Sequence, residues 1–132
     1  MKLRRVSVII FYDAKKRILV QDRTGISKRG EKWAFFGGHI EEGETPEQAV
    51  VRETKEELDF DLKEYRFIGM YDLSGDGHKV HAYVFISPLK DNLKKFAQKE
   101  GIGMKLVSAD EAKKIGMIPG DEMVVDEVMR II

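Results

Sequence analysis

The sequence predicts an α/β fold of the α+β class, in which a sheet and helices form a sandwich within one domain over residues 1–132. Two observations predict it. Strand-like segments precede a well-capped helix, and further strands and then helices follow it. The length of 132 residues suits one hydrophobic core, and no repeat, low-complexity tract or flexible linker divides the chain.

The first two predicted strands form a hairpin. Val6–Tyr12 and Arg17–Gln21 are apolar and rich in β-branched residues, and a short polar turn joins them. Trp33–Phe36 predicts a further short strand that runs into Gly37 and Gly38.

The next element is a helix from Pro46 to about Leu58. Thr45 suits the N-cap position, and Gln48 stands where a capping box requires it. A helical wheel predicts one apolar face, made by Val50, Val51, Thr54 and Leu58. It predicts an opposite, hydrophilic face, made by Arg52, Glu53, Glu56 and Glu57.

Strands and helices alternate less regularly after this helix. Tyr65–Asp72 and Lys79–Ser87 read as two strands joined by a glycine-containing turn, and Met104–Val107 reads as a third. Ser108 opens a short helix with capping-box spacing, and Asp121–Ile132 has the apolar spacing of a closing amphipathic helix. The order of these elements predicts a mixed α/β sandwich.

Composition narrows the classes of function. The 23 Lys and Arg balance 23 Asp and Glu, and this net charge of +0 argues against a nucleic-acid or membrane partner. The absence of cysteine excludes disulfides, thiolate metal sites and cysteine nucleophiles. The longest apolar stretches are strand-sized and no signal-peptide pattern is present, so we expect a cytoplasmic protein.

Three carboxylates crowd one turn of the predicted helix. Glu53 and Glu57 are spaced i,i+4, and Glu53 and Glu56 are spaced i,i+3. One interpretation is a solvated acidic face, with Arg52 and Glu56 as an ion pair. The other is that these oxygen ligands converge on magnesium, which binds carboxylates, waters and substrate phosphates.

The segment before the helix favours the second interpretation. From Gly38 the chain runs Gly-His-Ile-Glu-Glu-Gly-Glu, then seven residues, then Arg-Glu-Thr-Lys-Glu-Glu-Leu-Asp-Phe. This resembles the Nudix box, Gly-x5-Glu-x7-Arg-Glu-U-x-Glu-Glu-x-Gly-U with U aliphatic, at the opening glycine and at every charged position. Thr54 replaces an aliphatic residue, Asp59 replaces the later glycine, and Phe36 stands where the family often has proline. Threonine can still pack its methyl group, and aspartate tolerates a left-handed helix end.

The resemblance implies a Nudix-type α/β/α sandwich with a mixed β-sheet. It also implies a magnesium-dependent hydrolase, with manganese as a substitute, that cleaves the diphosphate linkage of a nucleoside diphosphate joined to another group. The implied metal ligands are the backbone carbonyl of Gly37 and the carboxylates of Glu53, Glu56 and Glu57.

The resemblance also implies roles for residues around the metal. Arg52 would orient a carboxylate through an ion pair, and Glu44 would support the loop or the metal shell. The family often recruits an acidic residue from outside the box, and Glu100 is the best candidate, although it reads equally well as an ordinary loop glutamate. Family members differ in the glutamate that activates water, so Glu53 and Glu100 both stay open as the base.

Three residues are candidates for binding the substrate: Arg23, Phe35 and Gly38. Family members often contact phosphates or the leaving group in the segment that holds Arg23. Phe35 could stack on a base, although aromatic residues in strands more often belong to the core.

The substrate class is less determined than the reaction. The short chain favours a nucleoside triphosphate, normal or oxidised, that yields a nucleoside monophosphate and pyrophosphate. Nucleoside diphosphate sugars and ADP-ribose are the alternatives, and a proline that the ADP-ribose subgroup tends to carry is missing near Gly75. A Nudix-like domain that binds nucleotides without hydrolysing them is an alternative of another class. The family often forms homodimers, and Val128, Ile131 and Ile132 could serve either a core or such an interface.

Overall fold

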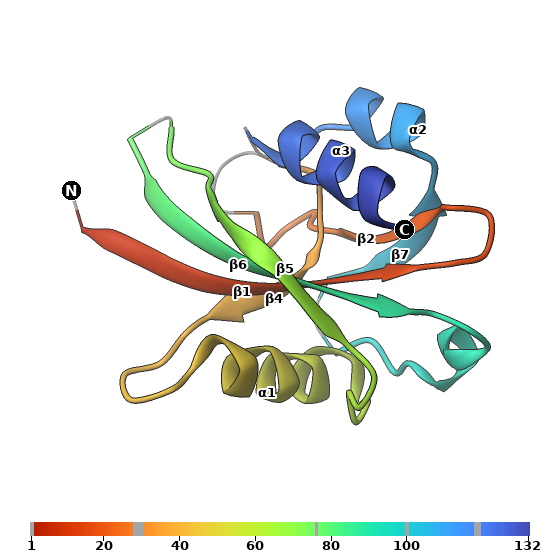
Figure 1. The fold of residues 1–132 in the computed structure, drawn as a ribbon, viewed down its shortest axis with the longest axis horizontal. Coiled ribbons are helices and arrows are strands. Elements are labelled where there is room, and N and C mark those ends of the chain that lie inside the picture. Colours follow the sequence, from red (N-terminus) through yellow and green to blue (C-terminus); the bar gives the residue numbers. More distant parts are fainter. Residues whose placement is uncertain (1, 28–30, 76, 100, 118–119) are drawn as a thin grey trace.

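One mixed sheet carries helices on both of its faces (Figure 1). Helix α1 (Pro46–Leu58) covers one face, and helices α2 (Ala109–Lys114) and α3 (Asp121–Ile131) cover the other. This arrangement confirms the α+β sandwich that the sequence predicts. The computed structural model describes residues 2–27, 31–75, 77–99, 101–117 and 120–132.

The sheet joins strands that are far apart in the sequence. The strands are β1 (Leu3–Tyr12), β2 (Ile18–Asp22), β3 (Trp33–Ala34), β4 (Phe36–His39), β5 (Arg66–Asp72), β6 (Lys79–Pro88) and β7 (Gly103–Val107). A short 3₁₀ helix at Asn92–Lys95 follows β6. β1 runs parallel to β6 over its whole length and antiparallel to β2 and β4, while β5 flanks β6 and β7 flanks β2.

The single strand expected over residues 33–36 is divided in two. β3 pairs with β2, whereas β4 pairs with β1, so the chain changes its partner strand at Phe35. The side chain of Phe35 packs into the core on the α3 side. The change of partner places Gly37 and Gly38 directly against β1.

Alternation along β1 sorts its side chains into two cores. Ile9 and Phe11 pack toward α1, whereas Ile10 packs toward α3. Each fully buried aliphatic or aromatic side chain contributes about 1.5–3 kcal/mol. Val128 is fully buried in the α3 core, and Ile131 and Ile132 pack partly against it, so the core interpretation is confirmed for Val128. No helix in the described ranges is long and apolar enough to cross a membrane.

Helix α1 begins and ends as the sequence predicts. Thr45 Oγ1 accepts a hydrogen bond from the Gln48 backbone N–H at 3.1 Å, and Gln48 Oε1 accepts one from the Thr45 N–H at 2.9 Å. Asp59 ends the helix in the left-handed conformation, with φ 51° and ψ 41°. Thr54 is fully buried and its hydroxyl donates to the Val50 carbonyl at 2.7 Å. The two departures from the box are therefore compatible with a regular helix.

Candidate active site

Arg52 lies at the centre of the acidic cluster. Its Nε and Nη2 donate to the two carboxylate oxygens of Glu44 at 2.7 and 2.9 Å. Its Nη1 donates to Glu53 Oε1 at 2.9 Å and to Glu56 Oε2 at 3.2 Å, and Nη2 also donates to the His39 carbonyl at 2.9 Å. Because a guanidinium presents its donors in a rigid fork, this one side chain connects the loop before α1 to two carboxylates on α1.

The ion pair between Arg52 and Glu44 shifts the pKa of both side chains. Hydrogen bonds from Arg52, followed by one from the Glu41 backbone N–H, lower the pKa of Glu44 from 4.5 to about 2. The hydrogen bonds to Glu44, and then those to Glu53 and Glu56, raise the pKa of Arg52. Glu44 therefore stays anionic at neutral pH, and its position suits the supporting role that the sequence predicts.

Two glycines bring the backbone of β4 close to its neighbours. A Cβ atom on Gly38 would lie 2.4 Å from Glu53 Cδ and 2.5 Å from both of its carboxylate oxygens. A Cβ atom on Gly37 would lie 2.1 Å from the Ser7 carbonyl oxygen, and Gly37 has a φ of +152°. A side chain on Gly38 would displace the Glu53 carboxylate, and a side chain on Gly37 would displace the backbone of β1 at Ser7.

The assignment of Glu57 to the hydrophilic face of the helix is wrong. Glu57 is only 2% exposed, on the same side of α1 as Val50 and Leu58. Glu57 follows Val50 by seven residues, so at 3.6 residues per turn it lies about 20° from Val50 on the helix and faces the sheet. There the Gly37 backbone N–H donates to Glu57 Oε1 at 3.0 Å. Because glycine has no side chain, the carboxylate can approach the backbone N–H of this strand closely.

The clustered acidic side chains of α1 have two different partners, Arg52 and Gly37. Within the described part of the chain, no three histidine, cysteine, aspartate or glutamate side chains form a group that could enclose a metal ion. Glu53 and Glu56 share Arg52, whose positive charge offsets the repulsion between them, and Glu57 accepts a hydrogen bond from Gly37. The atoms that could bind a metal ion are nevertheless carboxylate oxygens, which lie beside a glycine backbone. Oxygen ligands of this kind suit a hard divalent cation.

The segment before β7 is tied to the end of α1. The Lys99 N–H donates to the Glu57 carbonyl at 2.7 Å, and the Ala97 N–H donates to the Leu58 carbonyl at 2.8 Å. Glu100, a candidate for the base, lies outside the described residues.

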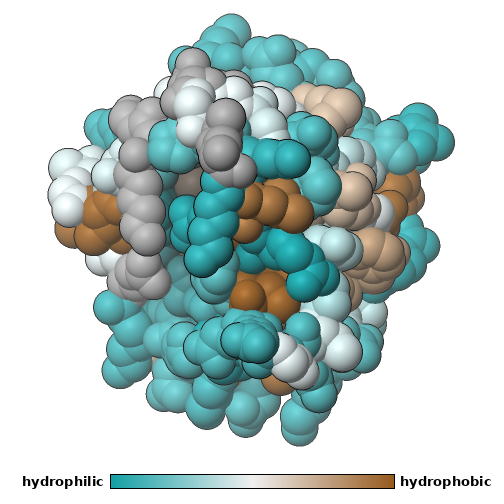
Figure 2. All heavy atoms as spheres, turned by 90° about the vertical axis from the view of Figure 1, so that its left-hand side faces the viewer, coloured by the Kyte–Doolittle hydropathy of each residue, from teal (hydrophilic) through white to brown (hydrophobic). Residues whose placement is uncertain are grey.

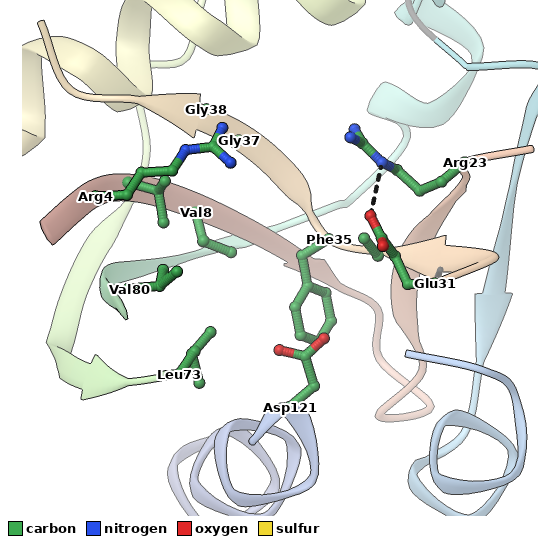
Figure 3. Close-up of a pocket in the computed structure, with 12 residues that line it drawn as sticks. Arg4, Val8, Arg23, Glu31, Phe35, Gly37, Gly38, Leu73, Val80 and Asp121 are labelled. Carbon is green, nitrogen blue, oxygen red and sulfur yellow. Dashed lines mark ion pairs between the residues drawn. The ribbon is translucent and has the colours of Figure 1, made fainter. Parts of the chain in front are cut away.

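A pocket of about 130 Å³ lies beside the glycine pair, on the α3 side of the sheet (Figure 3). Its apolar lining consists of Val6, Val8, Ala34, Phe35, Leu73 and Val80. Its charged lining consists of Arg4, Arg23, Glu31 and Asp121. The three residues predicted to bind substrate, Arg23, Phe35 and Gly38, all line this pocket. On the face turned to the viewer in Figure 2, apolar side chains likewise show between hydrophilic ones.

Buried polar groups hold Arg23 in place at the pocket. Its Nη1 donates to Gln21 Oε1 at 3.1 Å, and its Nε lies 3.6 Å from Glu31 Oε1. Gln21 is fully buried and Glu31 is 8% exposed, and Ser27 Oγ donates to the second Glu31 oxygen at 2.9 Å. The position of the Arg23 guanidinium is therefore fixed before any ligand binds.

Sequence reasoning missed three charged residues of the pocket: Arg4, Glu31 and Asp121. Asp121 is 3% exposed although it begins helix α3, where acidic residues are common because they face the positive end of the helix dipole. Its sequence position therefore carried no specific signal.

A sheet between helices, with an arginine and carboxylate cluster on a helix that packs against a glycine pair, defines the class of Nudix-fold proteins. The family model described as NUDIX domain matches residues 1–128, and the chain belongs to the Nudix family. Proteins of this family generally use divalent metal ions.

Two curated relatives are enzymes of nucleotide hydrolysis. The chain is 43% identical over 58 residues to the 8-oxo-dGTP diphosphatase of Escherichia coli (strain K12), covering 44% of this chain and 45% of that protein. It is 31% identical over 83 residues to the CTP pyrophosphohydrolase of the same organism, covering 63% of this chain and 60% of that protein. The chain therefore spans only 45% to 60% of the length of these relatives.

Solved structures with the same fold cover nearly the whole chain. The solution structure of the Escherichia coli ORF135 protein has a TM-score of 0.77 at 24% identity, covering 99% of this chain and 91% of that one. A MutT structure, from work on Aliivibrio salmonicida and Vibrio cholerae, has a TM-score of 0.76 at 23% identity, covering 99% and 100%. At these identities the likeness establishes the fold.

Proposed function

We propose that the protein is a magnesium-dependent pyrophosphohydrolase that converts a nucleoside triphosphate, normal or oxidised, into a nucleoside monophosphate and pyrophosphate. Manganese would substitute for magnesium. The observation that carries the proposal is the packing of the Glu53 carboxylate against the Gly38 backbone, at the edge of an apolar pocket with fixed charged groups. The named activities of the two curated relatives support the triphosphate class.

The proposed metal ligands are the Gly37 carbonyl and the carboxylates of Glu53, Glu56 and Glu57. When bound, the ion would neutralise charge on the phosphate oxygens and acidify a water molecule. Arg52 restrains Glu53 and Glu56 through its Nη1, so it limits the number of positions that these carboxylates adopt. The buried Glu57 is restrained in the same way by the Gly37 N–H.

The reaction needs a base near the phosphates. The water oxygen would form a bond to phosphorus, the bond from that phosphorus to the leaving oxygen would break, and a glutamate would accept the proton of the water. Glu53 and Glu100 are the two candidates. The position of Glu53 beside Gly38 supports the first.

The pocket supports a nucleoside as the other part of the substrate. Phe35 and the valines of β1 offer apolar surface for a base, and Asp121 offers a buried carboxylate that would accept hydrogen bonds from its N–H groups. Arg23 would bind the phosphates or the leaving group. Cytosine and 8-oxoguanine both present N–H donors, which agrees with the substrates in the names of the relatives.

A hydrolysis screen tests this proposal. The purified protein is incubated with 8-oxo-dGTP, dGTP, CTP, UDP-glucose and ADP-ribose, in the presence of magnesium or of EDTA, and products are resolved by ion-exchange chromatography. We expect magnesium-dependent formation of monophosphate and pyrophosphate from a triphosphate. Hydrolysis of UDP-glucose or ADP-ribose alone would replace the triphosphate class by one of the alternatives. Nucleotide binding without turnover of any compound would refute the enzyme assignment.

A further inference from the structure

Arg4 and Arg5 are adjacent in the sequence but lie in different environments. Side chains alternate along a strand, so the two guanidinium groups point to opposite faces of β1. Arg5 is exposed, and its Cζ lies 5.2 Å from the centroid of the Tyr83 ring. Arg4 is half-buried and lines the pocket together with Val6 and Val8.

Arg4 also differs from the other half-buried arginines. In the described ranges, each of the others lies within 3.6 Å of a carboxylate, in the pairs Arg17–Asp13, Arg23–Glu31 and Arg52–Glu44. The side chain of Arg4 has no hydrogen bond, ion pair or ring contact with any residue that the structure describes. Because a cation that is removed from water is costly without an anion beside it, the position of Arg4 indicates a ligand with negative charge.

The pocket has one cationic end and one acidic end. Figure 3 shows the guanidinium groups of Arg4 and Arg23 at the end marked by Gly37 and Gly38, and Asp121 at the end toward α3. A nucleotide has the same polarity, since its phosphates are anionic and its base carries N–H donors. The phosphates would therefore lie between the two arginines, next to the glycine pair.

We propose that Arg4 binds the phosphate chain of the nucleotide from the side opposite to Arg23, and that it determines the preference for triphosphate over monophosphate. This inference rests on the proposed function. Its chemical basis is that a guanidinium gains a charge-assisted hydrogen bond for each phosphate oxygen within reach. The monophosphate product has fewer such oxygens, so Arg4 would favour binding of the substrate over retention of the product.

The experiment compares Arg4→Gln with the matched control Arg5→Gln. KM and kcat are measured for CTP and 8-oxo-dGTP, and Ki is measured for CMP and 8-oxo-dGMP as product inhibitors. For Arg4→Gln we expect KM to rise about tenfold or more, with kcat within about twofold and Ki within about threefold of the wild type. Arg5→Gln should leave all three constants within about twofold, because Arg5 faces away from the pocket. Thermal unfolding checks that both variants are folded.

Other results would overturn the assignment. An Arg4→Gln variant with wild-type KM would show that Arg4 does not contact the substrate. An equal rise in KM and in the Ki of the monophosphate would show that Arg4 contacts a group that both compounds share, which is the base, the sugar or the α-phosphate, and would overturn its role in the preference for triphosphate. If the wild type hydrolyses neither triphosphate, the proposed function fails, and calorimetric titration with the same four nucleotides in EDTA then decides the role of Arg4 separately.

Discussion

The carboxylate of Glu53 occupies the space in which a side chain on Gly38 would lie. The distance from the ideal Cβ position on Gly38 to Glu53 Cδ is 2.4 Å, well inside van der Waals contact. Gly38 is not among the glycines with positive φ, so its backbone would accept an alanine. The Glu53 carboxylate, which we propose to be catalytic, is therefore what excludes a side chain at Gly38. The backbone of the sheet would tolerate a side chain there.

Gly38→Ala should separate activity from stability. We expect kcat/KM for the triphosphate to fall at least about 100-fold, because the added methyl group displaces Glu53 from its position beside the phosphates. The free energy of unfolding should change by less than about 1 kcal/mol, since the end of a flexible side chain can move. Gly103→Ala is the control, because a Cβ there meets no atom within 4 Å and should leave both quantities unchanged. Equal activity of the two variants would contradict the role of Glu53.

Glu57 should affect both stability and activity, whereas Glu56 should affect activity alone. Glu57→Ala leaves the Gly37 N–H without its acceptor, which should lower the free energy of unfolding by about 1–3 kcal/mol in urea titrations with EDTA present. Glu57→Gln keeps an acceptor and should lose less. Glu56 is exposed, so Glu56→Gln should stay within about 0.5 kcal/mol of the wild type. Glu56→Gln and Glu57→Gln should each lower kcat by orders of magnitude. Wild-type turnover by Glu57→Gln would refute the assignment of Glu57 as a metal ligand.

The pair of Glu44 and Arg52 predicts a defined pH dependence of stability. The pKa of Glu44 is about 2 in the folded protein and 4.5 ordinarily, so the unfolded chain takes up this proton at a higher pH. The stabilisation is therefore complete above about pH 4.5 and is lost as the pH falls toward about 2. Urea titrations of the wild type and Glu44→Gln should show a stability difference that is constant above this window and shrinks within it. A difference that does not vary with pH would contradict the prediction.

Asp121 should control the choice of base. Asp121→Ala removes the buried carboxylate of the pocket, and we expect kcat/KM for the preferred triphosphate to fall about 10- to 100-fold. The loss should be smaller for triphosphates whose bases present fewer N–H donors at that edge. The neighbouring Glu122 is exposed, and Glu122→Gln serves as the control. Equal losses for all bases would show that Asp121 acts on the fold or the phosphates rather than on the base.

Features set by local interactions were predictable from the sequence. The N-terminus of α1 follows from Thr45 and Gln48, which satisfy each other's backbone donors within one turn. The left-handed end at Asp59 follows in the same way from the conformations that aspartate tolerates. The charged positions of the box are likewise contained in one continuous segment.

Features set by contacts between distant segments were not predictable. The hydrogen-bond partner of Glu57 is the Gly37 N–H, which reaches it only because the chain changes its partner strand at Phe35. The pocket combines Arg4 from the first strand with Asp121 from the last helix, and neither has a motif around it. Periodicity describes one segment at a time, so it cannot identify the distant segment that a residue contacts.

The parallel pairing of β1 and β6 also has a kinetic consequence. Leu3 pairs with Lys79 and Tyr12 with Pro88, so this pairing closes a long loop of chain. The chain loses the entropy of loop closure before the contacts between the two strands stabilise the fold. Val6 and Val80 come from these two strands, and they line the same pocket only when the strands are paired. In refolding from urea, local helix formation in α1 should therefore precede the recovery of nucleotide binding, which makes ligand binding a specific signal for the last and slowest contacts to form.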